Sequence, residues 1–433
     1  MATLLTPIEG AEQFDEKPCR IALAGFGTVG SSVARLLQSR AEPALQLTHI
    51  YNRGISRKKV DWVATGVEWT ERFDDLLSSE VDVIVELMGG LEPAHQLVRR
   101  ALQSRKSVVT ANKQLMAQYG PELLALAGDN DQFLGFGACV AGGIPVLLGL
   151  QDGLAGDTLT RIRGILNGTC NYILTRMEKA EVAFADALAE AQRAGFAEAD
   201  PTDDVDGLDA AAKLAILARV AFNVDLAPNQ VACRSIGEIG LIDFAYAHEL
   251  DSTIRQISTA QWQDGCVYAN VGPALVPNDS PLAKVSGNQN LVVTSGEFGG
   301  DTSFGGNGAG GDPTAVAVVS DLVQAARHRC SGAVALPPRM AQPCRVTNDI
   351  ATAHYLRFVV RDRPGILAAL TEALSRRGIN VDAVLQKPNY PKSALPFVIT
   401  LEPCPERHLR AALAEIAAFD FLLQPPLSMP MME

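Results

Sequence analysis

Three kinds of segment are missing from this sequence. No apolar run reaches the roughly 18 residues that a membrane-spanning helix needs, so no membrane partner is expected. Residues 1–20 lack a basic start followed by an apolar stretch, which disfavours secretion. The 8 cysteines include no Cys-x-x-Cys pair and the 6 histidines are dispersed, so a zinc site is disfavoured and a reducing, cytoplasmic location is expected.

Positive charge is also scarce. The chain has 37 Lys and Arg against 49 Asp and Glu, which gives a net charge of −12. Binding to nucleic acid or to an anionic membrane requires a basic surface, so neither partner is expected. With 433 residues, of which 47% are hydrophobic and 20% charged, the chain is expected to fold as a globular protein of two or three domains.

The N-terminal part alternates apolar strands with helices. Strands are predicted at 21–25, 45–51, 81–86 and 107–110, and helices at 31–40 and 93–104. This order is typical of an α/β fold with a parallel sheet covered on both faces. A Rossmann-type domain is therefore predicted over 18–146.

The rest of the chain divides into two further domains. Residues 147–330 are less regular, with alanine-rich helical stretches, and predict an α+β domain for substrate binding and dimerisation, whose last helix packs back on the first domain. A linker over 331–349 contains Pro337, Pro338 and Pro343. Residues 350–433 show a β-α-β-β-α-β order, which is the ferredoxin-like arrangement.

A glycine-rich turn directly follows the first strand and precedes a helix. It satisfies G-x-G-x-x-G with Gly25, Phe26, Gly27, Thr28, Val29 and Gly30. Such glycines let backbone amides approach a pyrophosphate at the helix N-terminus. The alternative is an ordinary glycine turn, but the strand-turn-helix context favours a dinucleotide site.

The end of the second strand bears on the choice of cofactor. NAD enzymes usually place an acid about 20 residues after the glycines, to hold the ribose 2′-hydroxyl. Here the strand ends with Arg53, and no acid follows until Asp61. A guanidinium pairs well with a 2′-phosphate, so NADP is preferred over NAD. A solvated basic loop is the alternative.

Asp209 and Lys213 lie four residues apart in an alanine-rich helical stretch, so both project from one face. An alcohol oxidation needs a group that accepts the hydroxyl proton, and a lysine does this when burial or a neighbouring cation lowers its pKa. The alternative, more common among such pairs, is a surface salt bridge.

Two further sets of residues are candidates for chemistry: an acidic stretch before Asp209, and two cysteines. The acidic stretch from Glu198 to Asp206 is either a solvated loop or a partner for the ammonium of an amino-acid substrate. Cys139 and Cys170 invite a nucleophile hypothesis, but neither has a histidine nearby in the sequence, so buried packing roles are expected.

Six segments together closely resemble the homoserine dehydrogenase family, in the family's order, from about 21 to 321. They are residues 81–90, 110–113, 140–145, 164–169, 195–213 and 308–315. The resemblance implies NAD(P)-dependent interconversion of L-homoserine and L-aspartate 4-semialdehyde, in threonine, methionine and isoleucine biosynthesis, by a homodimer or homotetramer.

The resemblance also implies roles for single residues. Glu198 and Asp209 would bind the substrate, Lys213 would transfer the proton, and Lys113 would contact cofactor and substrate. Gly195 and Gly310 would approach the nicotinamide half of the cofactor. Whether Lys113 or Lys213 is the acid–base group stays open.

A monovalent cation, usually sodium, is bound in this family largely through backbone carbonyls. The matching positions are Gly137, Val140, Gly142 and Ile144. The sequence departs from the family where Gly137 replaces a common Glu and where Asn307 replaces a frequent basic residue.

The C-terminal domain resembles the ACT domain, an amino-acid-sensing module. The resemblance rests on 361–367 (RDRPGIL) and 378–381 (GINV). The turn at Asp362 and Gly365 leads into a helix whose free amides would hold an effector carboxylate, and Asn380 would add contacts. L-threonine, the end product of the pathway, is the expected effector; a role in dimerisation alone is the alternative.

Two rival functions remain. A non-enzymatic sensor of NAD(P) or amino acids would need a recognition surface, and the chain offers no basic recognition helix. A dehydrogenase of another amino-acid semialdehyde, such as aspartate-semialdehyde dehydrogenase, would need phosphate and a nucleophilic cysteine.

Overall fold

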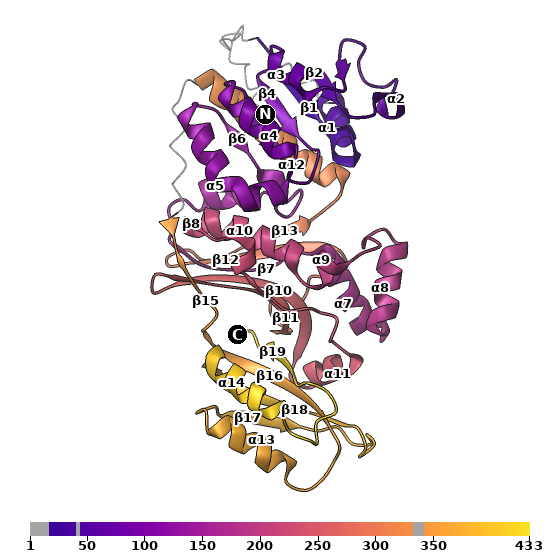
Figure 1. Ribbon diagram of the computed structural model, residues 1–433, viewed down its shortest axis with the longest axis vertical. Coiled ribbons are helices and arrows are strands. Elements are labelled where there is room, and N and C mark those ends of the chain that lie inside the picture. Colours follow the sequence, from indigo (N-terminus) through magenta and orange to yellow (C-terminus); the bar gives the residue numbers. More distant parts are fainter. Residues whose placement is uncertain (1–16, 40–43, 332–341) are drawn as a thin grey trace, which may run out of the picture.

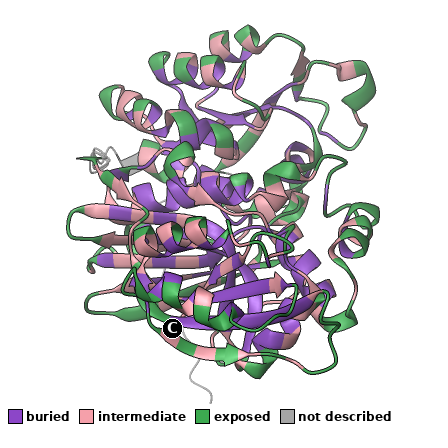
Figure 2. Cartoon of the chain, turned by 60° about the horizontal axis from the view of Figure 1, so that its bottom comes forward, coloured by how far each residue is buried: buried purple, intermediate pink, exposed green. Residues whose placement is uncertain are grey.

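Three units follow one another along the long axis of the molecule (Figure 1). The structure is a computed structural model, and it describes residues 17–39, 44–331 and 342–433. Buried residues gather in the strands of the sheets, while the outer faces of the helices are exposed (Figure 2). No helix in these ranges is long and apolar enough to cross a membrane.

The first unit is built on sheet A, whose six strands are all parallel in the order β3-β2-β1-β4-β5-β6. This is the Rossmann strand order. From β1 the sheet continues on one side with β2 and β3 and on the other side with β4, β5 and β6, and dinucleotides bind at this switch point between β1 and β4. Its strands are β1 (Cys19–Ala24), β2 (Leu45–Tyr51), β3 (Glu68–Thr70), β4 (Val83–Glu86), β5 (Ser107–Thr110) and β6 (Leu134–Gly135). The predicted parallel sheet is therefore confirmed.

Both faces of sheet A are buried, which explains why its strands read as continuous apolar runs. Ile21 and Leu23 of β1 face one apolar core, and Ala22 and Ala24 face the other. The helices of this unit are α1 (Thr28–Ser39), α2 (Ile55–Lys58), α3 (Phe73–Ser78), α4 (Ala94–Gln103) and α5 (Lys113–Asp129). The long α12 (Gly311–Ser331) returns from the second unit and packs beside α1. The helix predicted at 31–40 extends in the sequence to Arg40, which lies outside the described residues.

The second unit contains a seven-stranded sheet B, mostly antiparallel, that the irregular sequence pattern did not predict. Its strands are β7 (Leu159–Ile165), β9 (Ala232–Cys233), β10 (Ser252–Gln263), β11 (Cys266–Pro277), β12 (Gln289–Gly296), β13 (Gly300–Asn307) and β15 (Arg345–Thr347). The β10–β11 hairpin turns at Asp264 and Gly265, both with positive φ, as a type I′ turn requires.

Helices cover one face of sheet B. The central one is α10 (Leu208–Phe222), whose small alanines allow close packing against the sheet and against α5 of the first unit. The short η1 (Gly137–Cys139) still belongs to the first unit, after β6. The other elements between the first unit and the ACT unit are α6 (Val146–Leu148), η2 (Gly149–Gly153), α7 (Gly168–Ala180), α8 (Phe184–Arg193), α9 (Thr202–Val205), β8 (Val224–Asp225), η3 (Pro228–Gln230) and α11 (Leu241–Glu249).

The third unit has the predicted β-α-β-β-α-β order. It consists of β16 (Ala351–Val360), α13 (Ile366–Ser375), β17 (Val381–Leu385), β18 (Leu395–Pro405), α14 (Glu406–Ile416) and β19 (Leu427–Pro430). Leu356 and Phe358 of β16 face the unit's own core beneath α13 and α14. Tyr355 faces the opposite side, in a core shared with Tyr246 and Phe244 of the second unit. The two units are therefore firmly packed together.

The segment predicted as a linker is partly built into the fold. β14 (Gln342–Pro343) pairs with β8, and β15 pairs with β11 of sheet B. Pro337 and Pro338 lie outside the described residues. At least the last part of the segment is thus anchored to the second unit.

Candidate active site

A buried carboxylate, Asp209, stands at the meeting point of the first two units. Its Oδ2 lies 2.6 Å from Lys213 Nζ and its Oδ1 lies 2.6 Å from Lys113 Nζ. Asn167 Nδ2 donates a third hydrogen bond, 2.9 Å long, to Oδ2. The structure therefore brings two residues that are far away in the sequence, Lys113 and Asn167, to the Asp209–Lys213 pair, and the pair is not a surface salt bridge.

The local structure explains how these side chains meet. Asp209 and Lys213 lie one turn apart on α10. Lys113 begins α5 directly after β5, at the carboxyl edge of sheet A. Asn112 caps that helix by accepting from Leu115 N at 3.1 Å, and its own amide donates to Gly90 O at 2.6 Å. The cluster is thus held at the edge of sheet A where ligands of such folds bind.

One carboxylate here faces two ammonium groups. Burial alone would raise the pKa of Asp209, but Lys213 and Lys113 hold it well below its usual value. Burial likewise acts to lower the pKa of Lys113, but Asp209 outweighs it and raises that pKa above the ordinary value. The lowered lysine pKa that the sequence argument invoked is therefore not found at Lys113. The resting cluster holds this lysine in its protonated form.

The two lysines differ in what else they contact. The side chain of Lys213 is 13% exposed, and its Nζ also donates to Leu166 O at 2.9 Å. The side chain of Lys113 is 40% exposed. An ammonium has three donors, so each lysine keeps at least one for a ligand, and Lys113 keeps more.

The acidic stretch is divided between this cluster and the surface. Asp204 accepts from Asn167 Nδ2 at 2.6 Å, and burial raises its pKa. Glu198, in contrast, is exposed, and its carboxylate makes no hydrogen bond or ion pair with any residue that the structure describes. Gly195 and Gly310 are both exposed and have positive φ values of 74° and 122°.

The glycine-rich turn has the geometry of a dinucleotide loop. A Cβ on Gly25 would lie 2.7 Å from Leu87 O, and one on Gly30 would lie 2.2 Å from Gly25 O, so both positions require glycine. Gly27 faces open space, with nothing within 4 Å of where its Cβ would be. Phe26 packs edge-on against Trp69, and its N–H donates to Asn52 Oδ1 at 3.3 Å. Thr28 and Val29 open α1. These features fit a bound pyrophosphate at the start of α1.

Arg53 lies where a 2′-phosphate reader is expected, just after β2. It is exposed and makes no hydrogen bond or ion pair with the residues in the described ranges. Arg57 and Lys58 follow in the last turn of α2. The guanidinium of Arg53 is therefore free to bind a ligand.

The loop from Val140 to Ile144 turns sharply, because Ala141 and Gly142 both have positive φ. Among the described residues, no group donates a hydrogen bond to the carbonyl oxygens of Val140 and Gly142. The carbonyl of Ile144 accepts from Val146 N at 2.8 Å. Free carbonyls suit a hard monovalent cation, so the residues present fit the cation that the resemblance implies.

A carboxylate that sequence reasoning missed lies next to Gly137. Asp321 of α12 accepts from Gly137 N at 2.8 Å, and burial raises the pKa of Asp321 to about 7. A Cβ at Gly137 would lie only 2.9 Å from Asp321 Oδ1. The absence of a side chain at Gly137 was the available signal, since it leaves the space that Asp321 fills.

The two cysteines near the site are buried. Burial raises the pKa values of Cys139 and Cys170 well above the usual range. Their thiols point to Thr110 O at 3.4 Å and Asp204 O at 3.1 Å. A thiolate nucleophile is thus disfavoured at both positions.

The three residues predicted to bind an effector lie at the surface of the third unit. Gly365, with a φ of 94°, precedes α13, and Asp362 and Asn380 are exposed nearby in the sequence. Asn380 Nδ2 donates to Glu402 Oε2 at 3.0 Å. The structure does not bring Asn380 into contact with Asp362.

A Rossmann-ordered sheet, a glycine loop at its switch point and a buried Asp–Lys cluster at its carboxyl edge define an NAD(P)-dependent oxidoreductase. Three family models match the chain: the NAD-binding domain of homoserine dehydrogenase over 25–134, homoserine dehydrogenase over 145–323 and the ACT domain over 354–421. The chain belongs to the homoserine dehydrogenase family.

Individual relatives agree with this assignment. A homoserine dehydrogenase of Bacillus subtilis is 39% identical over 382 residues, which is 86% of this chain and 88% of that protein. A homoserine dehydrogenase structure from Thiobacillus denitrificans is 35% identical, with a TM-score of 0.89, and covers 96% of this chain and 99% of that one. A hyperthermophilic archaeal homoserine dehydrogenase in complex with NADPH is 27% identical, with a TM-score of 0.61, over 71% of this chain and 97% of that one.

Proposed function

We propose that this chain interconverts L-homoserine and L-aspartate 4-semialdehyde with NADP as the preferred cofactor, and that the Asp209 cluster handles the proton. The observation that supports this is one buried carboxylate holding two lysine ammonium groups at the carboxyl edge of sheet A. A bound nicotinamide supplies or accepts the hydride. The chain itself must bind the substrate, orient it and move one proton at the substrate oxygen.

In the direction of aldehyde reduction, a lysine ammonium donates its proton to the carbonyl oxygen as negative charge develops there. Before the reaction Asp209 is ionised and pairs with both lysine ammonium groups, because Lys213 and Lys113 hold its pKa below the ordinary value despite its burial. In the direction of alcohol oxidation, the same lysine must first lose a proton to solvent. We therefore expect oxidation to require a more alkaline pH than reduction.

We assign proton transfer to Lys213 and contact with cofactor and substrate to Lys113. Lys213 is the more enclosed of the two, so an ammonium there is shielded from bulk water. Lys113 follows β5 directly and lies closer to the edge of sheet A. Glu198 is proposed to pair with the substrate ammonium, since its carboxylate is exposed and without a partner among the described residues.

The proposed cofactor and cation sites each contain polar groups that have no hydrogen-bond partner among the described residues. Arg53 is free to pair with a 2′-phosphate, and the structure of the archaeal relative is a complex with NADPH. Gly137, Val140, Gly142 and Ile144 would hold a sodium ion through their carbonyls, of which those of Val140 and Gly142 accept no hydrogen bond from the described residues, and Asp321 lies beside Gly137. Gly195 and Gly310 are proposed to approach the nicotinamide. A homodimer or homotetramer with L-threonine as effector completes the proposal.

The proposed domain bounds remain 18–146, 147–330, 331–349 and 350–433. The test of function is a steady-state assay of the purified chain with L-homoserine and NADP, with and without phosphate. We expect NADP reduction that is independent of phosphate. A strict need for phosphate with a semialdehyde would favour the other dehydrogenase, and cofactor binding without turnover would favour a sensor.

A further inference from the structure

A buried arginine, Arg219, joins the two helices that carry the active-site cluster. It lies near the end of α10, and its side chain is 7% exposed. Its Nη1 donates to Met116 O at 2.8 Å and its Nη2 donates to Ala117 O at 3.2 Å, both in the first half of α5. These helices lie side by side where the first and second units meet (Figure 1). Arg219 therefore makes a contact between the units that the proposed proton transfer does not use.

The sequence of α5 provides a socket for this guanidinium, formed by Gly120 and Pro121. A Cβ on Gly120 would lie 2.6 Å from Arg219 Nη1, so the side chain lies there only because Gly120 leaves the space. Proline has no N–H, so Pro121 removes the usual intrahelical donor to Ala117 O, four residues earlier. Arg219 donates to that carbonyl instead. Gly120 thus makes the room, and Pro121 leaves the acceptor for Arg219.

The partners of Arg219 are mainly backbone carbonyls. Its Nη2 lies 3.5 Å from Asp225 Oδ1, but the side chain of Asp225 is 51% exposed, so this ion pair is loose. Burial lowers the pKa of Arg219, yet a guanidinium stays charged at every relevant pH. The contact with α5 is therefore present across the working pH range.

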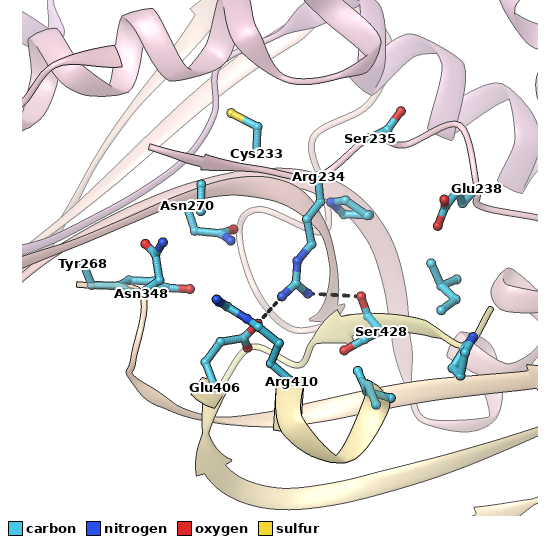
Figure 3. A pocket seen from close by; sticks show the side chains of 15 residues that line it. Cys233, Arg234, Ser235, Glu238, Tyr268, Asn270, Asn348, Glu406, Arg410 and Ser428 are labelled. Carbon is cyan, nitrogen blue, oxygen red and sulfur yellow. Dashed lines mark hydrogen bonds and ion pairs between the residues drawn. The ribbon is translucent and has the colours of Figure 1, made fainter. Parts of the chain in front are cut away.

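A second arginine between units shows a different arrangement. Arg234 joins the second unit to the ACT unit beside a cavity of about 500 Å³ (Figure 3). It donates to the carboxylate of Glu406 and, at 3.3 Å, to Ser428 O. A carboxylate on a side chain can rotate away from its partner, whereas the two carbonyls that Arg219 contacts are fixed in a helix. Arg219 therefore restrains the position of α5 more strictly than Arg234 restrains the ACT unit.

Two polar contacts hold α5 on α10. One is the ion pair between Lys113 Nζ and Asp209 Oδ1, and the other is Arg219 in its socket. Asp209 and Arg219 are about 15 Å apart along α10, at 1.5 Å per residue. One contact would let α5 turn about Asp209, but two contacts at this separation fix its direction. Ligands that bind the Lys113 ammonium compete with Asp209 for it, so the first contact weakens when they enter and the second remains.

We propose that Arg219 is a positioning residue for Lys113. By holding α5 in place, it keeps the Lys113 ammonium available to cofactor and substrate when Asp209 gives up part of its contact. This inference rests on the proposed role of Lys113 in contacting those ligands. Lys213 lies on the same helix as Arg219, so its own position does not depend on the socket. Loss of the Arg219 contact should therefore weaken ligand binding more than it slows proton transfer.

Two variants remove the contact in independent ways. Arg219→Met takes away the donors, and Gly120→Ala fills the space that the guanidinium occupies. Alanine is a better helix former than glycine, and the atom that must move is the end of a flexible side chain, so Gly120→Ala should fold normally. The matched control is Gly128→Ala, since Gly128 is exposed in the same helix.

The test measures the dissociation constant for NADPH by fluorescence titration without substrate, and KM and kcat for L-homoserine at saturating NADP. In Arg219→Met and Gly120→Ala, the dissociation constant and KM should rise about fivefold or more, within the range of coupling between contacting residues. The value of kcat should fall less than about threefold, and Gly128→Ala should change none of the three. In a Lys113→Met background, Arg219→Met should change the dissociation constant and KM less than about twofold, because the residue that it positions is gone.

Three results would overturn the proposal. The first is an equal effect of Arg219→Met with and without Lys113, which would make it a general packing contact. The second is an unchanged dissociation constant and KM in both variants. The third is a lower apparent kcat with KM and NADPH affinity unchanged, which would mean only that less protein is folded. Failure of the proposed reaction is distinct from these, because it would appear in the unsubstituted chain as NADPH binding without oxidation of homoserine.

Discussion

Two buried clusters in this molecule are each centred on an aspartate, and they differ in the cations that the aspartate holds. Asp209 holds two lysines and an asparagine amide between the first and second units. Asp243 of α11 holds Arg357 and, at 2.8 Å, the hydroxyl of Tyr355, and it also accepts from Gly240 N at 2.8 Å. The second cluster ties the ACT unit to sheet B and its neighbours.

The difference lies in the cation. A lysine ammonium shifts its pKa readily and can lose its proton, whereas an arginine guanidinium stays charged at every relevant pH. The Asp209 cluster also has more donors than acceptors, which leaves N–H groups for a ligand. At Asp243 both carboxylate oxygens are engaged by groups of the chain itself. The first arrangement can move a proton, and the second can only hold two units together.

The largest effect is expected from breaking the Asp243 cluster. Asp243→Ala leaves Arg357 buried and unpaired, which should cost about 3–5 kcal/mol of unfolding free energy. Urea denaturation, followed by tryptophan fluorescence and by proteolysis of the ACT unit, measures this. The double variant Asp243→Leu with Arg357→Leu is the control and should lose less, because no charge is stranded. A loss below about 1 kcal/mol in Asp243→Ala would show that the pair contributes little to docking.

The corresponding change at the first cluster should affect catalysis instead of folding. Lys213→Met should lower kcat about a hundredfold or more, the usual contribution of a positioned acid–base group, with little change in the urea midpoint. Lys113→Met should act mainly through KM for homoserine and NADP. Steady-state kinetics of both variants decide the assignment. The reverse pattern, with the larger kcat loss in Lys113→Met, would transfer the proton role to Lys113.

The sequence was informative about the Asp209 cluster because its parts lie within recognisable segments. Asp209 and Lys213 share one helical face, and the apolar runs of sheet A reveal a parallel sheet buried on both faces. The Asp243 cluster gave no such signal, since Arg357 lies 114 residues away in the chain. The contact between Asp321 and Gly137 spans 184 residues, and its one signal in the sequence was the missing side chain at Gly137.

Sheet B was missed for a different reason. Its strands carry polar residues such as Gln256 and Gln261 among apolar ones, so they do not read as continuous apolar runs. The alanine-rich α10 between them drew the prediction toward helices. The Asp264-Gly265 turn between two long alternating segments was the usable signal, because this dipeptide is typical of a tight hairpin.

A smaller, pH-dependent effect is expected at His354 of β16, which lies outside both clusters and faces Glu406 of the ACT unit. Burial, with Arg234 nearby, lowers the pKa of His354 to about 4 from 6.5, so the folded protein favours the neutral ring. This contribution to stability is complete above about pH 6.5 and is lost as the pH falls toward 4. At pH 5 the loss should be about 2 kcal/mol relative to pH 7.5.

Unfolding free energies at both pH values test this, with His354→Phe as the variant that cannot titrate. The decline between pH 7.5 and 5 should become smaller in that variant, whatever its absolute stability. Glu406 faces His354 and could offset part of the effect when it is ionised, so Glu406→Gln is measured alongside. An unchanged decline in His354→Phe would assign the pH dependence to other groups.

The smallest effect is expected at the cofactor end of the first unit, away from both clusters. Arg53→Gln removes the guanidinium that we propose reads the 2′-phosphate, so KM for NADP should rise about tenfold, the equivalent of one charge-assisted hydrogen bond. KM for NAD, which has no such phosphate, should change less than about twofold. Arg57→Gln is the matched control, since Arg57 is also exposed and lies in the following helix α2. If both variants raised KM for NADP equally, the preference would come from the summed positive charge of this loop. If Arg53→Gln raised KM for both cofactors by one factor, Arg53 would act on a part that NAD and NADP share, and the phosphate would be read elsewhere.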